Sequence, residues 1–180
     1  MVRTDTYTEQ ELRAMVRDIP DFPIPGILYR DITPILGDSR GLASSVHLLA
    51  ERVRGLGPID IVTAAEARGF LFAAPLAVQL NAGLVPIRKP GKLPWKTLSY
   101  SYALEYGTNE LNIHADAIPV GARVLLVDDL LATGGTMDAC VKLVEQAGGV
   151  PVGCAFLIEL TELDGRTKLA GNEVVSLIQC

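Results

Sequence analysis

The chain alternates short, almost wholly apolar runs with segments whose apolar residues recur every three or four positions. Unbroken runs rich in Val, Ile and Leu suit strands buried on both faces, whereas the wider spacing suits helices with one buried face. The predicted strands cover residues 59–64, 84–88, 124–127, 150–160 and 173–178, and the predicted helices cover residues 8–17, 39–54, 69–81 and 135–148. This alternation predicts an α/β fold with a mostly parallel central sheet and helices on both faces.

Local signals mark several element boundaries. Thr8 and Glu11 have the spacing of a capping box at the start of the first helix, and Ser39 is the expected cap of the second. Residues 98–105 and 109–114 are expected to pair as a hairpin around a glycine-containing turn. This hairpin and the two ends of the chain are expected to form a smaller cap beside the sheet.

Composition indicates a single domain, residues 1–180, in the cytoplasm. A chain of 180 residues buries a sufficient core without covalent staples. The net charge of −5 argues against general nucleic-acid binding. The first residues lack the apolar core of a signal peptide, and the most apolar run, 69–78, is too short to cross a membrane. Cys140, Cys154 and Cys180 are an odd number without C-x-x-C spacing, which predicts neither a disulfide framework nor a zinc site.

Residues 123–137, RVLLVDDLLATGGTM, carry the clearest chemical pattern. An apolar strand ends in Asp128 and Asp129, and open α/β sheets bind ligands at the carboxyl ends of their strands. The following turn can surround an anion with backbone N–H groups, and the next helix directs its N-terminal dipole to the same point. The turn residues are Ala132, Thr133, Gly134, Gly135 and Thr136.

The order of these residues predicts a site for phosphate and ribose, but it matches neither of two familiar nucleotide-binding turns. The turn is not a Walker loop, because G-x-x-x-x-G-K-[ST] is absent, and it is not a dinucleotide fingerprint, because G-x-G-x-x-G is absent. A solvated strand-to-helix loop is the alternative interpretation.

A second candidate is the basic segment 86–98. It contains Arg88, Lys89, Lys92 and Lys96 without an acidic residue. Its prolines and glycine keep it out of regular structure, so we expect a lid that closes over an anionic substrate and excludes water. A solvated basic surface loop is the alternative.

The acids and turn at 128–136 resemble the 5-phosphoribosyl-1-pyrophosphate signature of the type I phosphoribosyltransferases. Four further segments resemble, in order, those of the family members that act on adenine: residues 21–36, 65–70, 87–112 and 157–160. The resemblance implies the type I phosphoribosyltransferase fold, with a small hood over the base and a flexible lid hairpin. About residues 1–36 and 160–180 are then expected to contribute to the hood.

The resemblance also implies an activity. The chain would transfer the phosphoribosyl group from 5-phosphoribosyl-1-pyrophosphate to adenine N9 and release AMP and pyrophosphate in purine salvage. Magnesium is the implied cofactor, held through substrate and water near Asp128 and Asp129, without a protein cage. A homodimer is the implied assembly, with neither nucleic acid nor membrane as partner.

Residue roles carried over by the resemblance fall into four groups. The first group holds the ribose and the 5-phosphate: Asp128 and Asp129 for the ribose hydroxyls, and the turn 132–136 for the phosphate. The remaining groups are pyrophosphate binding, by Ala67, Arg68, Arg88, Lys89 and Lys92; adenine binding, by Leu28, Tyr29, Arg30 and Leu160; and catalysis, by Glu105 and Arg68.

Some details of these roles differ from the family or stay open. Tyr29 stands where the family more often has Phe, so its hydroxyl needs a partner or access to water. The side chain of Arg30 is expected to pair with Asp31, a glutamate or a phosphate. The resemblance also implies a non-proline cis peptide at Glu66-Ala67 or Ala67-Arg68.

Two other functions remain open at this point. One is a phosphoribosyltransferase for a 6-oxopurine or xanthine. The other is a transcription regulator that senses phosphoribosyl pyrophosphate, although the acidic chain offers no basic face for DNA. His47 and His114 are expected to be structural, because neither lies in a recognisable catalytic motif, and the sequence does not decide the role of Trp95.

Overall fold

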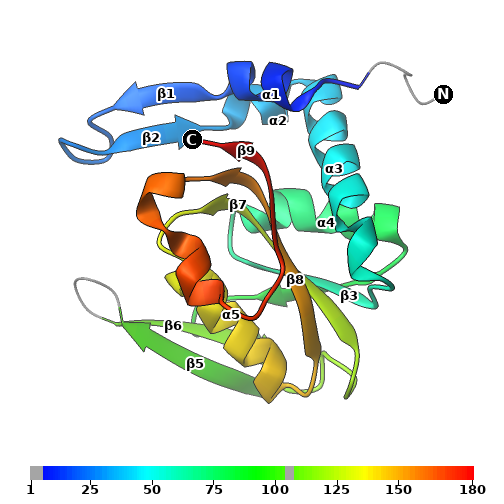
Figure 1. Cartoon of the computed structure of the whole chain (residues 1–180). Coiled ribbons are helices and arrows are strands. Elements are labelled where there is room, and N and C mark those ends of the chain that lie inside the picture. Colours follow the sequence, from blue (N-terminus) through cyan, green and yellow to red (C-terminus); the bar gives the residue numbers. More distant parts are fainter. Residues whose placement is uncertain (1–5, 104–107) are drawn as a thin grey trace.

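The computed structural model describes residues 6–103 and 108–180. Its centre is a five-stranded, wholly parallel sheet in the order β4-β3-β7-β8-β9 (Figure 1). The strands are β3 (Ile61–Ala65), β4 (Gly83–Ile87), β7 (Arg123–Leu131), β8 (Val150–Glu159) and β9 (Val174–Gln179). The predicted parallel sheet is therefore confirmed.

Helices cover both faces of this sheet and bury a core on each side. On one face, α3 (Ser39–Val53) and α4 (Gly69–Leu80) pack on β3, β7 and β8 in a cluster that includes Leu49, Phe72 and Leu76. On the other face, α5 (Gly135–Gln146) packs in a second cluster that includes Leu143 and Phe156. Cys140 and Cys154 are buried free thiols in this second cluster.

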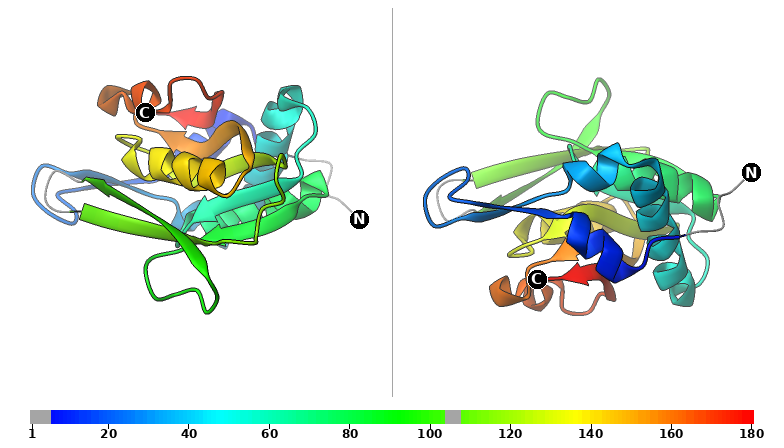
Figure 2. Two further views of the ribbon diagram at one scale, coloured as in Figure 1. Left: turned by 90° about the horizontal axis from the view of Figure 1, so that it is seen from below. Right: turned by 90° about the horizontal axis from the view of Figure 1, so that it is seen from above.

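Two antiparallel ribbons flank the sheet. The N-terminal ribbon pairs β1 (Arg17–Pro20) with β2 (Leu28–Asp31), and the second pairs β5 (Thr97–Ala103) with β6 (Thr108–His114). Both ribbons project on the same side of the molecule (Figures 1 and 2). Leu111 and Ile113 of β6 are buried beside α5, so the base of the second hairpin belongs to the core rather than to a separate cap.

Short helices complete the fold. They are α1 (Glu9–Met15), α2 (Thr33–Gly37), and the 3-10 turns η1 (Arg54–Leu56), η2 (Thr161–Leu163) and η3 (Gly165–Leu169). None of the helices in the described ranges is long and apolar enough to span a bilayer.

Helix boundaries test the predicted caps. The capping box of α1 is confirmed: the Glu11 backbone N–H donates to Thr8 Oγ1 over 3.2 Å, and the Thr8 N–H donates to Glu11 Oε2 over 2.7 Å. The predicted cap Ser39 is wrong, because Asp38 is the N-cap of α3 and accepts a hydrogen bond from Gly41 N over 2.6 Å. A carboxylate one residue earlier is the stronger cap here, since it also favours the positive end of the helix dipole.

Candidate active site

The carboxyl end of β7 opens into a cavity of about 200 Å³. Seven predicted site residues line it, namely Asp128, Asp129, Ala132, Thr133, Gly134, Gly135 and Thr136, and Arg68 reaches it from the N-terminus of α4. The strand is longer than predicted, because β7 pairs with β8 as far as Leu131 and so contains both acids. The acids are therefore fixed by the sheet rather than by a loop.

The two acids are electrostatically unequal. Burial, followed by the charge of Asp129, holds the pKa of Asp128 well above its usual range. Burial raises the pKa of Asp129 as well, but Arg68 opposes this rise, since its Nε lies 3.0 Å from Asp129 Oδ2. Asp128 Oδ1 accepts a hydrogen bond from the Asp129 backbone N–H over 2.9 Å. The site thus holds two adjacent carboxyl groups whose charged forms would be stabilised by hydroxyl donors or by a cation.

Gly69, the first residue of α4, lets Asp128 approach the neighbouring strand-to-helix turn. A Cβ at Gly69 would lie 2.8 Å from Asp128 Oδ1 and 3.1 Å from the carbonyl oxygen of Val127. Any larger residue would therefore displace the carboxylate. The requirement explains why glycine follows Arg68 at this turn.

Arg68 connects three segments that are distant in sequence. Besides the ion pair with Asp129, its Nη1 donates to the Tyr29 hydroxyl over 2.6 Å, and its guanidinium lies 5.6 Å from the centre of the Tyr29 ring. Arg68 is therefore the partner that the Tyr29 hydroxyl needs. The contact joins the N-terminal ribbon to the acids of β7.

The turn before Arg68 is joined to the basic segment by Glu66. Arg88 donates through Nη2 to Glu66 Oε2 over 2.9 Å, and the Lys89 backbone N–H donates to Glu66 Oε1 over 2.5 Å. These contacts lower the pKa of the Glu66 carboxyl, the Lys89 N–H more than the Arg88 side chain. The Glu66-Ala67 peptide is cis, one of the two positions expected. Glu66 thus anchors the first residue of the segment that follows β4.

Beyond this anchor the segment is exposed. Lys89, Lys92, Lys96 and Trp95 are all exposed, and Figure 2 shows the green loop between β4 and β5 standing away from the body. Lys89 and Lys92 do not line the cavity. The basic segment therefore starts at the site but does not cover it in this conformation.

The turn of residues 132–136 has a neighbour on each side. On one side, the Tyr102 hydroxyl of β5 lies 3.2 Å from Thr136 Oγ1. On the other side, Gly134, at φ +80°, leaves no room for a side chain, because a Cβ there would overlap the carbonyl oxygen of Gly165. Packing from β5 and η3 therefore shapes the turn.

Predicted residues for the base lie outside the cavity. Leu28 is exposed and Tyr29 is half-buried on β2, and Leu160 follows β8, where its N–H donates to the Leu131 carbonyl over 2.9 Å. The expected pairing of Arg30 with Asp31 is wrong: its Nη1 pairs with Asp18 Oδ1 over 2.6 Å across the ribbon. Glu105 lies outside the described residues.

Sequence reasoning did not assign Glu66 or Tyr102. Glu66 carried a readable signal, an acid that precedes Arg68 and could complement the basic segment. The contact of Tyr102 depends on how the hairpin packs against α5, which the local sequence does not specify.

The chain matches the model of the phosphoribosyl transferase domain over residues 33–174, and it belongs to that family. Within the family it belongs with the adenine phosphoribosyltransferases. It is 55% identical to the enzyme of that name from Thermoanaerobacter pseudethanolicus over 96% of this chain and 99% of that one. The curated enzyme of that name from Rhodopirellula baltica is 54% identical over 96% of this chain and 84% of that one.

Solved structures of that enzyme agree with the fold. The crystal structure from Thermoanaerobacter pseudethanolicus superposes with a TM-score of 0.93, covering 96% of this chain and 100% of that chain at 55% identity. The Saccharomyces cerevisiae enzyme, complexed with adenine and an imino-altritol bisphosphate, has a TM-score of 0.90 at 37% identity, with 94% of this chain and 97% of that chain covered. The resemblance inferred from the sequence is confirmed.

Proposed function

We propose that this chain is a pentosyltransferase that moves the phosphoribosyl group of 5-phosphoribosyl-1-pyrophosphate to N9 of adenine, with AMP and pyrophosphate as products. The observation that carries the proposal is the cavity at the end of β7, where two acids, an arginine and an anion-binding turn meet. The relatives' names and the adenine bound to the yeast enzyme support adenine as the base.

Substrate binding follows from the polarity of the cavity. Asp128 and Asp129 accept hydrogen bonds from the ribose 2- and 3-hydroxyls, which relieves the cost of holding two adjacent carboxylates poorly solvated. The turn 132–136 and the first turn of α5 hold the 5-phosphate with backbone N–H groups that have no partner within the helix.

Pyrophosphate binding uses the turn at Ala67 and Arg68 together with Arg88, Lys89 and Lys92. Breaking the bond at ribose C1 leaves positive charge on the sugar and negative charge on the departing pyrophosphate, so cations at the leaving group lower the barrier. Arg68 lines the cavity, and in this proposal it leaves its ion pair with Asp129 as the ribose hydroxyls arrive. Glu105 is the proposed group for proton transfer at adenine.

Adenine binding is assigned to the hood, residues 1–36 and 160–180. The base stacks on Tyr29 and contacts Leu160, while backbone groups of Leu28, Tyr29 and Arg30 read its edge. In support, β2 pairs only with β1 within the described residues, so its other edge offers backbone donors and acceptors.

Magnesium is the proposed cofactor, carried by the substrate. Within the described residues no three His, Cys, Asp or Glu side chains cluster as a metal cage, and of the site acids only Asp128 and Asp129 face the cavity. This donor set fits a cation that is held mainly by pyrophosphate, ribose and water oxygens. When bound, the ion would neutralise charge on the pyrophosphate.

Two further properties belong to this proposal. A homodimer is supported by an apolar face on α4, where Leu71 and Val78 are seven residues apart and exposed by 46% and 82%. A cytoplasmic location is consistent with Cys140, Cys154 and Cys180, which are free thiols.

The experiment is a turnover assay with four bases. Purified protein with phosphoribosyl pyrophosphate and magnesium should use adenine and reject hypoxanthine, xanthine and guanine. Adenine presents a donor at N6 and an acceptor at N1, whereas hypoxanthine reverses both, and each buried unmet group costs ~1–3 kcal/mol. Discrimination in kcat/KM of roughly 30-fold to 10⁴-fold is expected. Use of hypoxanthine within about threefold of adenine would replace this function with that of a 6-oxopurine enzyme.

A further inference from the structure

The segment after β8 forms one wall of the phosphate turn. A Cβ on Gly165, at the start of η3, would overlap the carbonyl oxygen of Ala132, and one on Gly134 would overlap the carbonyl oxygen of Gly165. Gly165 is buried, although the residues around it are exposed. The two backbones therefore touch with no side chain between them, and the position of η3 determines the position of the turn.

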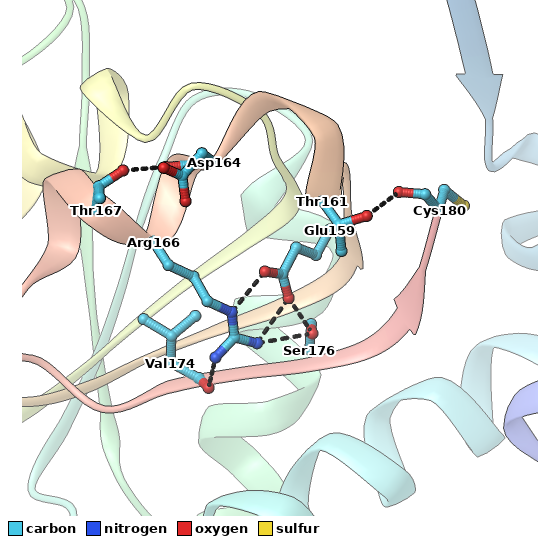
Figure 3. Close-up of polar contacts among 8 residues, drawn as sticks. All are labelled: Glu159, Thr161, Asp164, Arg166, Thr167, Val174, Ser176 and Cys180. Carbon is cyan, nitrogen blue, oxygen red and sulfur yellow. Dashed lines mark hydrogen bonds and ion pairs between the residues drawn. The ribbon is translucent and has the colours of Figure 1, made fainter.

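An ion pair between Arg166 and the buried Glu159 holds η3 in place (Figure 3). Arg166 donates to both oxygens of Glu159, from Nε over 2.5 Å and from Nη2 over 2.7 Å. Its Nη1 donates to the Val174 carbonyl over 3.0 Å, and Ser176 Oγ donates to Glu159 Oε2 over 2.5 Å. Glu159 is buried on β8, and Arg166, followed by Ser176, lowers its pKa. The bidentate geometry fixes the orientation of η3 as well as its distance from the sheet.

This anchoring places a lysine along the phosphate turn. Lys168 Cβ lies 3.2 Å from the point that a Cβ on Gly134 would occupy, and Lys168 Nζ lies 3.7 Å from the corresponding point at Gly135. The side chain therefore passes one glycine and ends beside the next. Gly135 is also the first residue of α5, so the ammonium stands at the positive end of that helix.

A cation at a helix N-terminus is unfavourable unless an anion lies between them. Nothing in residues 6–103 or 108–180 forms an ion pair with Lys168. Lys168 therefore adds a positive charge beside a turn whose backbone N–H groups can already hold an anion.

We propose that Lys168 binds the 5-phosphate of the substrate from the outer side of the turn, and that Arg166 is a positioning residue that holds it there through Glu159. The inference rests on the proposed function, because it assigns the phosphate of that same substrate. Lys168 supplies the charge, while the turn supplies the backbone donors.

Equilibrium binding of AMP and adenosine by calorimetry tests the role of Lys168, since the two ligands differ only in the 5-phosphate. Lys168→Met should weaken AMP binding by about 10-fold to 100-fold, the range for hydrogen bonds to charged groups, and change adenosine binding by less than about twofold. Lys168→Arg should restore most of the AMP affinity. Lys142→Met, the same change at a partly exposed lysine on α5, is the matched control and should bind both ligands as the wild type does.

The role of Arg166 is tested by comparing Tm with the ratio of AMP to adenosine affinity. If it only stabilises the fold, Arg166→Gln lowers Tm and leaves the ratio of AMP to adenosine affinity unchanged, which would overturn the positioning role. If it positions Lys168, the ratio falls, and adding Lys168→Met to Arg166→Gln lowers it little further. Ser176→Ala, a milder change that removes one donor to Glu159, should move the ratio in the same direction.

AMP affinity in Lys168→Met within about twofold of wild type would overturn the inference and leave the proposed function standing. Failure of the wild type to bind AMP at all would instead refute the proposed function.

Discussion

At the scale of single residues, Asp128 lowers the stability of the folded protein but favours the binding of ribose hydroxyls. Its carboxyl is largely withdrawn from water beside a second carboxyl, and the neighbouring cation Arg68 pairs with Asp129 instead. A carboxylate held this way raises the free energy of the folded protein without ligand, and hydrogen bonds from ribose hydroxyls offset that rise. The cost should therefore be measurable as a dependence of stability on pH.

Asp128→Asn should raise Tm at neutral pH and lower kcat/KM by at least ~100-fold. The folded pKa of Asp128 lies above the unfolded value of about 3.9, so the native state holds the proton more tightly and loses stability as pH rises through that window. Thermal unfolding from pH 3 to pH 8 should show the advantage of the variant growing with pH and vanishing below about pH 4. Asp138→Asn, which removes an acid from the first turn of α5, is the control and should not raise Tm. An Asp128→Asn variant that is less stable than wild type at neutral pH would contradict this account.

Tyr29 combines two contacts that substitution can separate. Tyr29→Phe keeps the ring but removes the 2.6 Å hydrogen bond from Arg68, so we expect KM for adenine within about threefold of wild type and a loss of about 1 kcal/mol in unfolding free energy. Tyr29→Ala removes the stacking surface and should raise that KM at least about tenfold. Steady-state kinetics and denaturant unfolding of both variants provide the measurement. Equal damage by both substitutions would show that the hydroxyl, rather than the ring, dominates.

At the scale of elements, the segment between β4 and β5 has a fixed start and a free middle. Glu66 holds Arg88 and the Lys89 backbone, whereas Lys92, Trp95 and Lys96 are exposed. Like charges in the free part repel one another until an anion neutralises them. A short, charged segment that is held at its ends, by Glu66 at Lys89 and by the Ala115 N–H at the Lys96 carbonyl, and exposed in its middle is suited to close over a bound pyrophosphate.

Trypsin should therefore cut within residues 89–96 in the free protein and much more slowly with phosphoribosyl pyrophosphate and magnesium. Ribose 5-phosphate with magnesium is the matched control, because it fills the phosphate turn but brings no pyrophosphate to the lid, and it should leave cleavage nearly unchanged. Glu66→Gln weakens the anchor and should speed cleavage of the free protein. Cleavage at one rate in all ligand states would identify this segment as an ordinary surface loop.

At the scale of the whole molecule, the parts of the site that are continuous in sequence were predictable and those assembled across segments were not. The acids and turn of residues 128–136 form one strand-turn-helix unit, so their order alone fixed their geometry. The pairs Tyr29–Arg68 and Glu66–Arg88 join segments 39 and 22 residues apart, and their formation depends on how separate elements pack. Lys168 was missed for the same reason: only the contact of η3 with the turn brings it to Gly135.

The last prediction concerns assembly, which also belongs to this scale. The outer face of α4 exposes Leu71 and Val78, and the adjacent start of β4 exposes Leu84, while the opposite face of α4 is buried in the core. A second copy of the chain would remove this apolar surface from water, so light scattering should give twice the chain mass of 19.3 kDa. Val78→Glu places a charge in that contact and should shift the protein toward the monomer mass without lowering its helix content. Val120→Glu makes the same change at a residue exposed by 91% elsewhere on the surface, and it should leave the mass unchanged. A wild-type monomer, or a dimer that Val78→Glu does not weaken, would mean that this face of α4 is not the contact between copies.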